Sequence, residues 1–578
     1  MTISGADIII HFLETAGVRI VAGVPGGALL PLYEALGRTS TIRHILARHE
    51  QAAGFIAQGM ARVSGRAGVC LATSGPGVTN MVTALADAKL DSVPLICIAG
   101  QVPTGLIGTD AFQEVATTEM VRPITKACYF VNSAAELPDI LAQAFRVAEG
   151  GRPGPVLVDV PKDVQLQRLP CWPSSSGSGL DAPVSYESHL RQARDHRRAY
   201  AQAVEMIRSS SRPLFYFGGG IVKARAQEAA RALVEQTGIP ATSSLMALGI
   251  LPREHALNIG MLGMHGARYT NHAIEMADVL ITIGARFDDR ATGHAASFAS
   301  GARIIHIDID ERELGKIKRP TIAIQDDAAR ALMELRGLSS AAAAKPAAWE
   351  AWRARIQDLK RDYPLATPGS EELCSPYGIM HALGERIPED AIITTDVGQH
   401  QMWAAQTLPI HRADRWLTSG GLGTMGFGLP AAIGAALACP QSPVFCITGD
   451  GSLLMNIQEL ATLVELDANV KIIVLDNSAL GLVRQQQELF YQKRLVASRF
   501  AHRTDFVAIA RAFGLRAHDL GSCYDDARLL DQVLSSRGPA LIRVPIDERH
   551  HVLPMVPSGG KNTEPLDHVP ASLDEVLI

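Results

Sequence analysis

The sequence predicts an α/β protein of three domains, each a doubly wound parallel sheet with helices on both faces. Three observations favour this fold class. Short, fully apolar runs alternate with amphipathic helical stretches, which is typical of strands buried on both faces. The chain has 578 residues, and a prior of about 150 residues per domain gives three to four domains. A Ser/Gly stretch at 173–179 and an Ala-rich stretch at 339–346 divide the chain into three segments.

The two stretches set the expected boundaries. The first is typical of a flexible linker, whereas the alanine run could also form helix. We therefore expect domains at 1–170, 191–340 and 366–550, linkers at 171–190 and 341–365, and a C-terminal arm at 551–578. The arm is rich in Pro and Gly, and two alternatives stay open for it: an arm that orders over the functional site, or disorder.

Each segment contains apolar runs that predict buried strands. Ligands of parallel sheets bind beyond the carboxyl ends of the strands, so we expect functional residues in the turns that follow these runs. The runs lie at 68–72, 95–99 and 156–160 in the first segment, at 213–217, 279–283 and 304–309 in the second, and at 392–395, 444–448 and 470–475 in the third.

Composition and charge exclude several classes of protein. The formal charge is −5, from 54 Lys and Arg against 59 Asp and Glu, so neither nucleic acid nor a membrane surface is an expected partner. The eight cysteines form no CxxC pair and several lie in apolar runs, which predicts reduced thiols in a cytoplasmic protein. The N-terminal stretch has no signal-peptide pattern, and Gly and Pro interrupt the longest apolar runs.

One strand end carries a candidate phosphate and metal site. The run at 444–448 leads into Gly449, Asp450, Gly451 and Ser452, and a helix is expected at 456–466. Glycines let backbone N–H groups approach phosphate oxygens, and Asp450 offers a hard carboxylate oxygen. Taken alone, the motif is also typical of an ordinary Asp-Gly turn.

The next strand favours the metal site. The run at 470–475 is followed by Asp476 and Asn477, and a parallel strand–helix–strand unit brings both strand ends together. Asp450, the Asn477 amide oxygen and one backbone carbonyl, assigned to Ala479, would leave octahedral positions for phosphate oxygens and water. Few protein ligands completed by phosphate oxygens are typical of Mg²⁺.

These paired motifs resemble the diphosphate-binding motif of thiamine-diphosphate enzymes. The family has an Asn-Asn pair where this chain has Asp476-Asn477, a departure that changes the charge near the site. Such an enzyme also needs a carboxylate that protonates the aminopyrimidine ring, and the candidate is Glu50, in Arg48-His49-Glu50-Gln51. Without the motif, Glu50 would be interpreted as a first-turn glutamate favoured by the helix dipole.

Over nearly its full length the chain resembles the large catalytic subunits of acetohydroxyacid synthase (acetolactate synthase), bacterial isozyme I type. The motifs that carry the resemblance, in chain order, lie at 24–27, 47–62, 72–80, 108–114, 152–155, 161–164, 259–266, 284–290, 394–403, 418–436 and in the Gly-Asp-Gly and Asp-Asn pair. The resemblance implies a pyrimidine-binding first domain, a central FAD-binding domain and a third domain that binds diphosphate and Mg²⁺. Each thiamine site would lie between the first domain of one chain and the third of another, in a homodimer or homotetramer.

The resemblance also assigns roles to residues. In the third domain, Val397, Gly398, Gln399 and His400 would hold the diphosphate. Gly423 would contact the pyrimidine amino group through its backbone, and Met425 would bend the cofactor into its V shape; read without the family, Met425 could be plain core.

FAD contacts are implied in the central domain. The glycines that follow the run at 213–217 would permit close approach of a pyrophosphate. The implied residues are Gly218, Gly219, Gly220, Ser244, Leu245, Met246, Met264, His265, Gly284, Ala285, Arg286, Asp288, Arg290, Asp308 and Ile309.

The activity implied by the resemblance is the carboligation of 2-ketoacids. Pyruvate would be decarboxylated on thiamine diphosphate, and the hydroxyethyl enamine would condense with a second 2-ketoacid, with FAD playing no redox part. Gln113 and backbone near Gly26 would stabilise oxyanions, and Phe112 and Lys162 would line the approach. A small regulatory subunit and a role in branched-chain amino acid biosynthesis are also implied.

A departure from the family bears on the acceptor. The family usually has a Trp in the segment that here contains Leu482, Val483 and Gln486, and alignment places that Trp at Gln486. A flat apolar wall favours the ethyl group of 2-ketobutyrate over the methyl group of pyruvate. One methylene in an apolar pocket contributes about 1–3 kcal/mol of discrimination between two substrates. We therefore expect a bias to pyruvate as the acceptor, with 2-ketobutyrate still accepted, and weaker binding of herbicides that stack on the Trp.

Alternatives of other kinds stay open. One is a flavin-dependent oxidoreductase of the same superfamily, such as pyruvate oxidase. Another is a catalytically silent homologue, which the presence of Glu50, Asp450 and Asn477 disfavours. Glyoxylate carboligase lacks the glutamate that faces the pyrimidine, so Glu50 argues against it.

Overall fold

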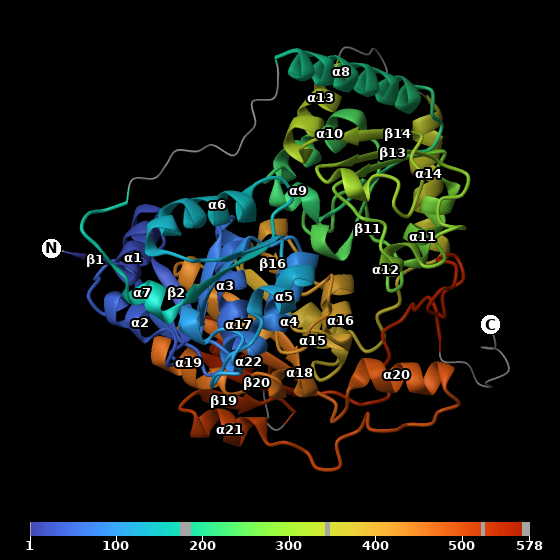
Figure 1. Cartoon of the computed structure of the whole chain (residues 1–578). Helices are drawn as coiled ribbons and strands as arrows, with labels where there is room; N and C mark the ends of the chain where they lie inside the picture. Colours follow the sequence, from blue (N-terminus) through green and yellow to red (C-terminus); the bar gives the residue numbers. More distant parts are fainter. Residues whose placement is uncertain (1, 174–185, 341–346, 522–525, 569–578) are drawn as a thin grey trace.

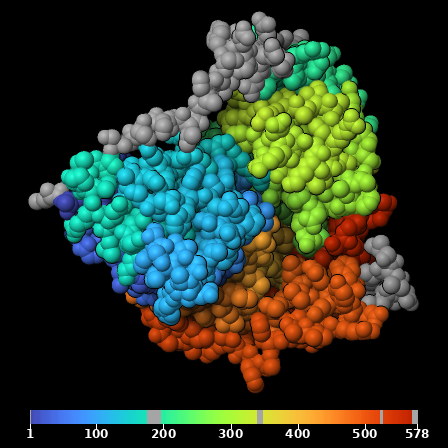
Figure 2. All heavy atoms as spheres, in the orientation of Figure 1, coloured from blue at the N-terminus to red at the C-terminus, as the bar shows by residue number. Residues whose placement is uncertain are grey.

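Three six-stranded sheets, all of whose strand pairings are parallel, form the framework of the protein in a computed structural model that describes residues 2–173, 186–340, 347–521 and 526–568. Helices cover both faces of each sheet, so the predicted fold class is confirmed. Figure 1 shows the first domain in blue, the central domain in green and yellow, and the third in orange and red. In Figure 2 they form three lobes.

The first and third domains share one topology. Their strand orders are β3-β2-β4-β5-β7-β6 and β16-β15-β17-β18-β20-β19, which is the same sequence of crossovers in each domain. The strands are β2 (Ile20–Val24), β3 (Arg43–Leu46), β4 (Gly68–Ala72), β5 (Leu95–Gln101), β6 (Ala127–Phe130), β7 (Pro155–Pro161), β15 (Ile392–Thr395), β16 (Trp416–Leu417), β17 (Val444–Gly449), β18 (Val470–Asp476), β19 (Arg516–Asp519) and β20 (Ala540–Pro545). Short strands β1 (Ile3–Ser4) and β8 (Arg168–Leu169) pair antiparallel at the start and end of the first domain.

The central sheet has the order β11-β10-β9-β12-β13-β14. Numbered within the domain this is 3-2-1-4-5-6, the order of dinucleotide-binding folds, in which ligands bind where the order reverses. That point lies between β9 and β12, which end at Phe217 and Ile283. The strands are β9 (Pro213–Phe217), β10 (Ala241–Ser243), β11 (Asn258–Met261), β12 (Val279–Ile283), β13 (Arg303–Asp308) and β14 (Ile322–Gln325).

Each of the three domains contributes seven or eight α-helices to the described residues. The first domain has α1 (Gly5–Thr15), α2 (Leu30–Leu36), α3 (Glu50–Ser64), α4 (Pro76–Leu90), α5 (Thr117–Val121), α6 (Leu137–Glu149) and α7 (Lys162–Leu166). The central domain has α8 (Tyr186–Arg208), α9 (Gly219–Lys223), α10 (Gln227–Thr237), α11 (Arg268–Met276), α12 (Asp289–Thr292), α13 (Ala328–Ser340) and α14 (Ala347–Asp362). The third has α15 (Pro376–Gly384), α16 (Gln399–Thr407), α17 (Gly428–Ala438), α18 (Asp450–Leu454), α19 (Glu459–Leu466), α20 (Gly481–Phe490), α21 (Phe506–Ala512) and α22 (Asp526–Ser535).

Helices α3 and α17 join the first and third domains through one continuous apolar core (Figure 1). They cross so closely that glycines are required at the contact. A methyl group on Gly59 of α3 would collide with the Ala431 carbonyl of α17, and one on Gly434 of α17 would collide with the Ile56 carbonyl. Since the middle of α3 and most of α17 are buried and carry several Gly and Ala residues, backbone meets backbone at this crossing.

Two expectations about local structure are corrected. The helix expected at 456–466 is α19, which begins at Glu459, and a separate helix, α18, begins at Asp450 itself. An acidic residue in the first turn suits the positive end of a helix, which favours this early start. Residues 347–362, expected in a linker, form α14, whose Trp349 and Trp352 indoles donate hydrogen bonds to the Ser210 and Pro213 carbonyls of the central domain. The linker at 174–185 and residues 341–346 lie outside the described residues.

The described part of the C-terminal arm packs against the molecule. Val552, Met555 and Val556 are buried, and the Val556 N–H donates to the Met264 carbonyl at 2.8 Å. Met555 also pairs with Leu566 across a two-sided backbone bridge. The arm is therefore ordered as far as residue 568, and residues 569–578 lie outside the described part. Among the described residues, no helix has both the length and the apolar character to cross a membrane.

We expect Gly59→Ala to destabilise the protein, because the added methyl group must push the α17 backbone away. Overpacking of a close-packed core costs about 1–3 kcal/mol. Gly301→Ala is the control, because no atom lies within 4 Å of its added methyl group. Thermal unfolding of both variants checks the prediction, which is wrong if they melt together.

Candidate active site

The carboxyl ends of β17 and β18 bring the predicted metal ligands together. Asp450 is buried and accepts hydrogen bonds from the Gly451 N–H at 2.7 Å and from the Ala479 N–H at 3.2 Å. The Asn477 amide nitrogen donates to Gln399 Oε1 at 3.1 Å, which leaves the amide oxygen for another partner. Burial raises the pKa of the Asp450 carboxyl to about 7. A buried carboxylate, an amide oxygen and nearby backbone suit a hard cation such as Mg²⁺.

His400 supplies a buried imidazole beside this carboxylate. Its ring lies against the backbones of Gly398 and Gly449, where a methyl group on either glycine would come within 2.8 Å of ring atoms. Burial lowers the pKa of the imidazole to about 3, so the ring is neutral. Its Nε2 atom has no hydrogen-bond partner among the described residues. An orphaned polar atom in a glycine cradle fits the expected diphosphate.

The departure at Asp476 is compensated. Its carboxylate pairs with Arg543 at 2.6 Å and with Arg503 at 3.2 Å, and Arg543 is itself buried. It also accepts the Ser478 N–H at 3.1 Å. Two arginines therefore pair with the charge that a neutral Asn would lack. The Asp476 carboxyl also lies close to Asp450 and adds to the effect of burial in raising the pKa of Asp450.

Asp396, which follows β15, organises the turn before α17. Its buried carboxylate accepts backbone N–H groups of Val397 at 2.9 Å, Gly426 at 2.8 Å and Gly428 at 3.0 Å. Burial nevertheless raises the pKa of this carboxyl to about 6. Met425 lies in the same turn, with its methyl carbon 3.7 Å from the position of a methyl group on Gly451. The predicted wedge and the diphosphate motif are thus neighbours.

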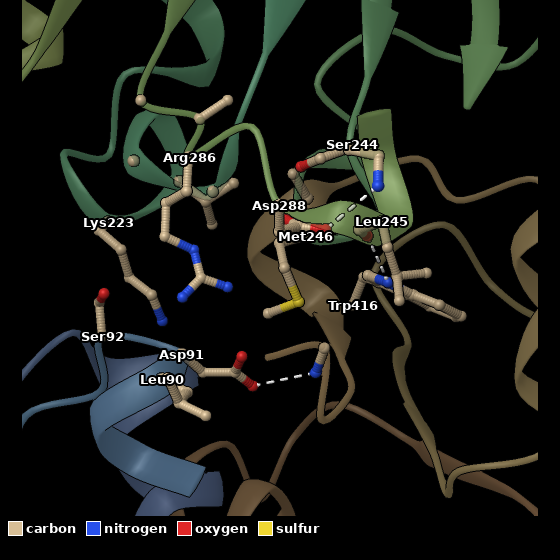
Figure 3. Close-up of a pocket in the computed structure, with 18 of the residues that line it drawn as sticks. Leu90, Asp91, Ser92, Lys223, Ser244, Leu245, Met246, Arg286, Asp288 and Trp416 are labelled. Carbon is tan, nitrogen blue, oxygen red and sulfur yellow. Dashed lines mark hydrogen bonds between the residues drawn. The ribbon is translucent and has the colours of Figure 1, made fainter. Parts of the chain in front are cut away.

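A buried ion cluster holds the loop at 418–424, which carries Gly423. Arg62 of α3 pairs with Asp91 at 2.8 Å and with Asp87 at 3.4 Å, both on or next to α4. Asp91 accepts the Gly420 and Gly421 N–H groups at 3.2 and 2.7 Å; a dashed line in Figure 3 marks a backbone bond of this kind at Asp91. Asp87 accepts the Ser419 hydroxyl. The first domain therefore positions a loop of the third.

The predicted residues of the first domain lie in loops or at helix starts at the carboxyl edge of its sheet. Glu50 begins α3 and accepts the Asn80 amide N–H at 2.9 Å. Gly26 lies against Thr73, and Gln113, with φ +63°, lies against Gly75. Lys162 begins α7, directly after β7. Phe112 is 88% exposed, which is unusual for a large apolar side chain.

A cavity of about 580 Å³ runs between the three domains. Figure 3 shows side chains from the first, central and third domains converging on it. Of the predicted FAD residues all except Gly218 line the cavity, and so do Val397, Gly423, Leu482 and Gln486 of the third domain. The expected flavin and thiamine regions are therefore connected. Val483 does not line the cavity, and its side chain is 47% exposed.

The three glycines at 218–220, which follow β9, have different structural roles. The Gly218 N–H donates to the Ile283 carbonyl at 2.9 Å, and the Gly220 N–H donates to the Gly284 carbonyl at 3.0 Å. Added methyl groups on Gly218 or Gly220 would clash with the Gly284 backbone. Gly218 is therefore required by the contact between the ends of β9 and β12, whereas Gly219 and Gly220 also face the cavity.

Sequence reasoning missed several residues of the cavity. Arg62, Asp91, Arg152, Lys223, Gln401 and Trp416 line it but were not assigned. Arg152 lies in the family motif at 152–155, which is a signal that could have identified it as a cation beside a ligand site. Arg62, Asp91 and Lys223 lie in helices or turns without a local phosphate signature, so only the tertiary structure brings them here.

Comparisons with known proteins define the class first. Three family models match in order: the thiamine pyrophosphate enzyme N-terminal TPP binding domain at 3–120, the central domain at 200–335 and the C-terminal TPP binding domain at 396–544. Together they cover more than half of the chain. The protein is therefore a thiamine-diphosphate-dependent enzyme.

Curated relatives then define the family. The acetolactate synthase isozyme 1 large subunit of Escherichia coli is 52% identical over 563 residues, 97% of each chain. The isozyme 2 large subunit of the same organism is 43% identical, covering 98% of this chain and 99% of its own. A probable chloroplastic acetolactate synthase 2 of Oryza sativa is 44% identical, covering 96% and 85%. The chain belongs to the acetolactate synthase large subunits, as the sequence motifs predicted.

We expect Asp91→Asn to loosen the loop at 418–424, because Arg62 loses one of its two carboxylates. Removing one partner of a buried ion pair costs about 3–5 kcal/mol. The melting temperature should fall, and the KM for thiamine diphosphate should rise, because Gly423 lies in the released loop. Asp358→Asn, which breaks only an exposed pair with Arg361, should change stability by about 0.5 kcal/mol or less. Equal effects of the two substitutions would contradict the positioning role.

Proposed function

We propose that this enzyme decarboxylates pyruvate and joins the resulting two-carbon unit to a second 2-ketoacid, releasing 2-acetolactate when the acceptor is pyruvate. The observation that carries the proposal is the set of Asp450, Asn477 and the orphaned His400 nitrogen at one sheet edge. The family models and the relatives named above support it. A role in branched-chain amino acid biosynthesis belongs to the same proposal.

Mg²⁺ and FAD belong to the proposal as cofactors. Asp450, the Asn477 amide oxygen and the Ala479 backbone would hold Mg²⁺ and, through it, the diphosphate. Val397, Gly398, Gln399 and Ser452 surround that position, and the Ser452 hydroxyl already donates to the Val397 carbonyl at 2.8 Å. The cavity, at the switch point of a dinucleotide-type sheet, suits FAD, which would be retained without a redox step.

The chain's own residues prepare the reaction. Bound thiamine diphosphate supplies an electron sink for the loss of carbon dioxide. The Asn80 amide N–H donates to Glu50 Oε2. The other oxygen, Oε1, would hold a proton for the aminopyrimidine ring of bound thiamine diphosphate. Gly423 and Met425 would orient that ring, and proximity of reacting groups lowers the barrier. Gln113 and backbone near Gly26 would stabilise negative charge on substrate oxygen.

A complete site needs a second copy of the chain. Glu50, Gln113 and Phe112 are not among the described residues that line the cavity. Large apolar side chains are exposed near both halves of the site, including Phe112 at 88%, Met455 at 53% and Leu46 at 46%. Exposed apolar groups of this kind mark interaction surfaces. A homodimer, or a tetramer of two dimers, would cover them and bring Glu50 to the partner's third domain.

A small regulatory subunit is a further proposed partner, supported by the description of the E. coli relatives as large subunits.

The alternative of a pyruvate oxidase-like enzyme makes a different demand on the flavin. Bleaching of flavin absorbance during turnover would support the oxidase, whereas turnover with an unchanged flavin spectrum supports carboligation.

Gln486 would set the choice of acceptor. It lines the cavity together with Leu482, whereas the adjacent Gln485 is buried and holds Val552 of the arm through two hydrogen bonds of 2.8 and 2.9 Å. A polar side chain at 486 offers no flat apolar wall, so pyruvate should compete well with 2-ketobutyrate.

Glu50→Gln is the test of the proposed chemistry. Formation of acetolactate from pyruvate, with thiamine diphosphate, Mg²⁺ and FAD, should fall roughly 10²–10⁴-fold, the usual contribution of a positioned acid or base. Glu228→Gln, at an exposed position, is the control and should keep full activity. An active protein that is insensitive to Glu50→Gln would refute the mechanism.

Gln486→Trp tests the acceptor pocket. The ratio of 2-aceto-2-hydroxybutyrate to acetolactate, measured with both acceptors in competition, should rise by about tenfold or more, since one methylene in an apolar pocket is worth about 1–3 kcal/mol. Gln486→Ala removes the amide without adding a wall and should change the ratio far less. A strong preference for 2-ketobutyrate in the unmodified enzyme would contradict the assignment.

A further inference from the structure

Two cations of the central domain point into the cavity without partners. Lys223 ends α9 and Arg286 follows β12; in Figure 3 both side chains reach toward the space above Asp91 and Ser92. Within the part of the chain that the structure describes, neither side chain forms a hydrogen bond or an ion pair. Lys223 is partly exposed and borders the cavity, and the burial of its ammonium group lowers the pKa of that group to about 7.

The other arginines that line the cavity have ion-pair partners, and that of Arg290 is Asp289 at 3.9 Å. Arg62 is held by Asp87 and Asp91, and Arg152 is held by Glu313 at 2.7 Å and Asp310 at 3.2 Å. Asp91, the carboxylate that faces Lys223, is saturated by Arg62 and two backbone N–H groups. Lys223 and Arg286 are therefore two cations that line the cavity without an ion pair of their own among the described residues. The carboxylates that act on Lys223, Asp91 and Asp87, are already paired with Arg62.

A buried, unpaired cation is costly unless a ligand neutralises it. Arg presents a planar fork and Lys a compact charge, and phosphate accepts both. The same cavity has Asp308 at the carboxyl end of β13, where a carboxylate suits a ribose hydroxyl. The cavity thus combines a site for hydroxyls with a site for an anion, which matches a nucleotide.

We propose that Lys223, together with Arg286, binds a phosphate of the flavin dinucleotide, and that Lys223 is a cofactor-binding residue of this chain. The inference rests on the proposed function, because that proposal supplies FAD as the ligand. The inference goes beyond the proposed function by naming the charged contact to the phosphate and the residue that provides this contact.

The test measures ligand affinity on the full-length apoprotein by quenching of flavin fluorescence. A charged hydrogen bond is worth enough that Lys223→Met should weaken FAD binding roughly 10- to 100-fold. Riboflavin, which has no phosphate, should bind the variant and the unmodified protein alike, and FMN shows whether the phosphate next to the ribityl chain is the one bound. Lys223→Arg should stay within a few fold of the unmodified protein.

A second measurement separates ligand binding from a structural role. Because Lys223 has no partner to lose, the apoprotein of Lys223→Met should melt at an unchanged or higher temperature, while the stabilisation by added FAD should shrink. Lys318→Met, which removes a lysine that donates to the Ala295 carbonyl, is the matched control and should bind FAD normally.

Each outcome has a clear meaning. Equal losses for FAD and riboflavin, or unchanged FAD affinity in Lys223→Met, would overturn the phosphate contact while leaving the proposed function intact. An unmodified protein that binds no FAD would overturn the flavin part of the proposed function and this inference with it.

Discussion

The buried cluster of Arg62, Asp87 and Asp91 is the interaction on which the rest of the site depends. It joins α3 and the α4 end of the first domain to the loop at 418–424 of the third through two ion pairs and several backbone N–H groups. A buried ion pair gains little net stability against an apolar replacement, but breaking it is costly. The cluster acts here by fixing geometry, because it holds the loop at 418–424, which reaches the cavity and is followed by Met425.

The crossing of α3 and α17 connects parts of the site that are far apart in the sequence. Helix α3 begins at Glu50 and crosses α17 at Gly59, and α17 follows the turn that Asp396 organises. The acid that would face the pyrimidine and the glycine crossing therefore lie on one closely packed pair of helices, and the loop at 418–424 precedes the second of them. The C-terminal arm adds a second tie, since Gln485 on α20 holds Val552 while the His265 ring lies 3.3 Å from the Pro554 carbonyl.

Much of the fold followed from the sequence because fully buried parallel strands have an unmistakable pattern. The strands at 68–72, 213–217, 279–283 and 392–395 match the structure residue for residue. Helix α14 was misassigned because an alanine-rich run has no sharp boundary signal, and its tryptophans are explained only by hydrogen bonds to the central domain. The proximity of Asp450 and Asn477 was predictable because they follow adjacent parallel strands of one sheet, β17 and β18.

The sequence by itself determined the fold class, the order of the three domains, the family and the residues that follow each strand. Those features are local, since strand periodicity and turn chemistry are written within a few neighbouring residues. Only the tertiary structure decided that Gly218 serves a backbone contact, that two arginines balance Asp476, and that Lys223 and Arg286 face one cavity. The reason is that these charges are far apart in the sequence. Only the packed structure shows which of them form ion pairs and which have none among the described residues.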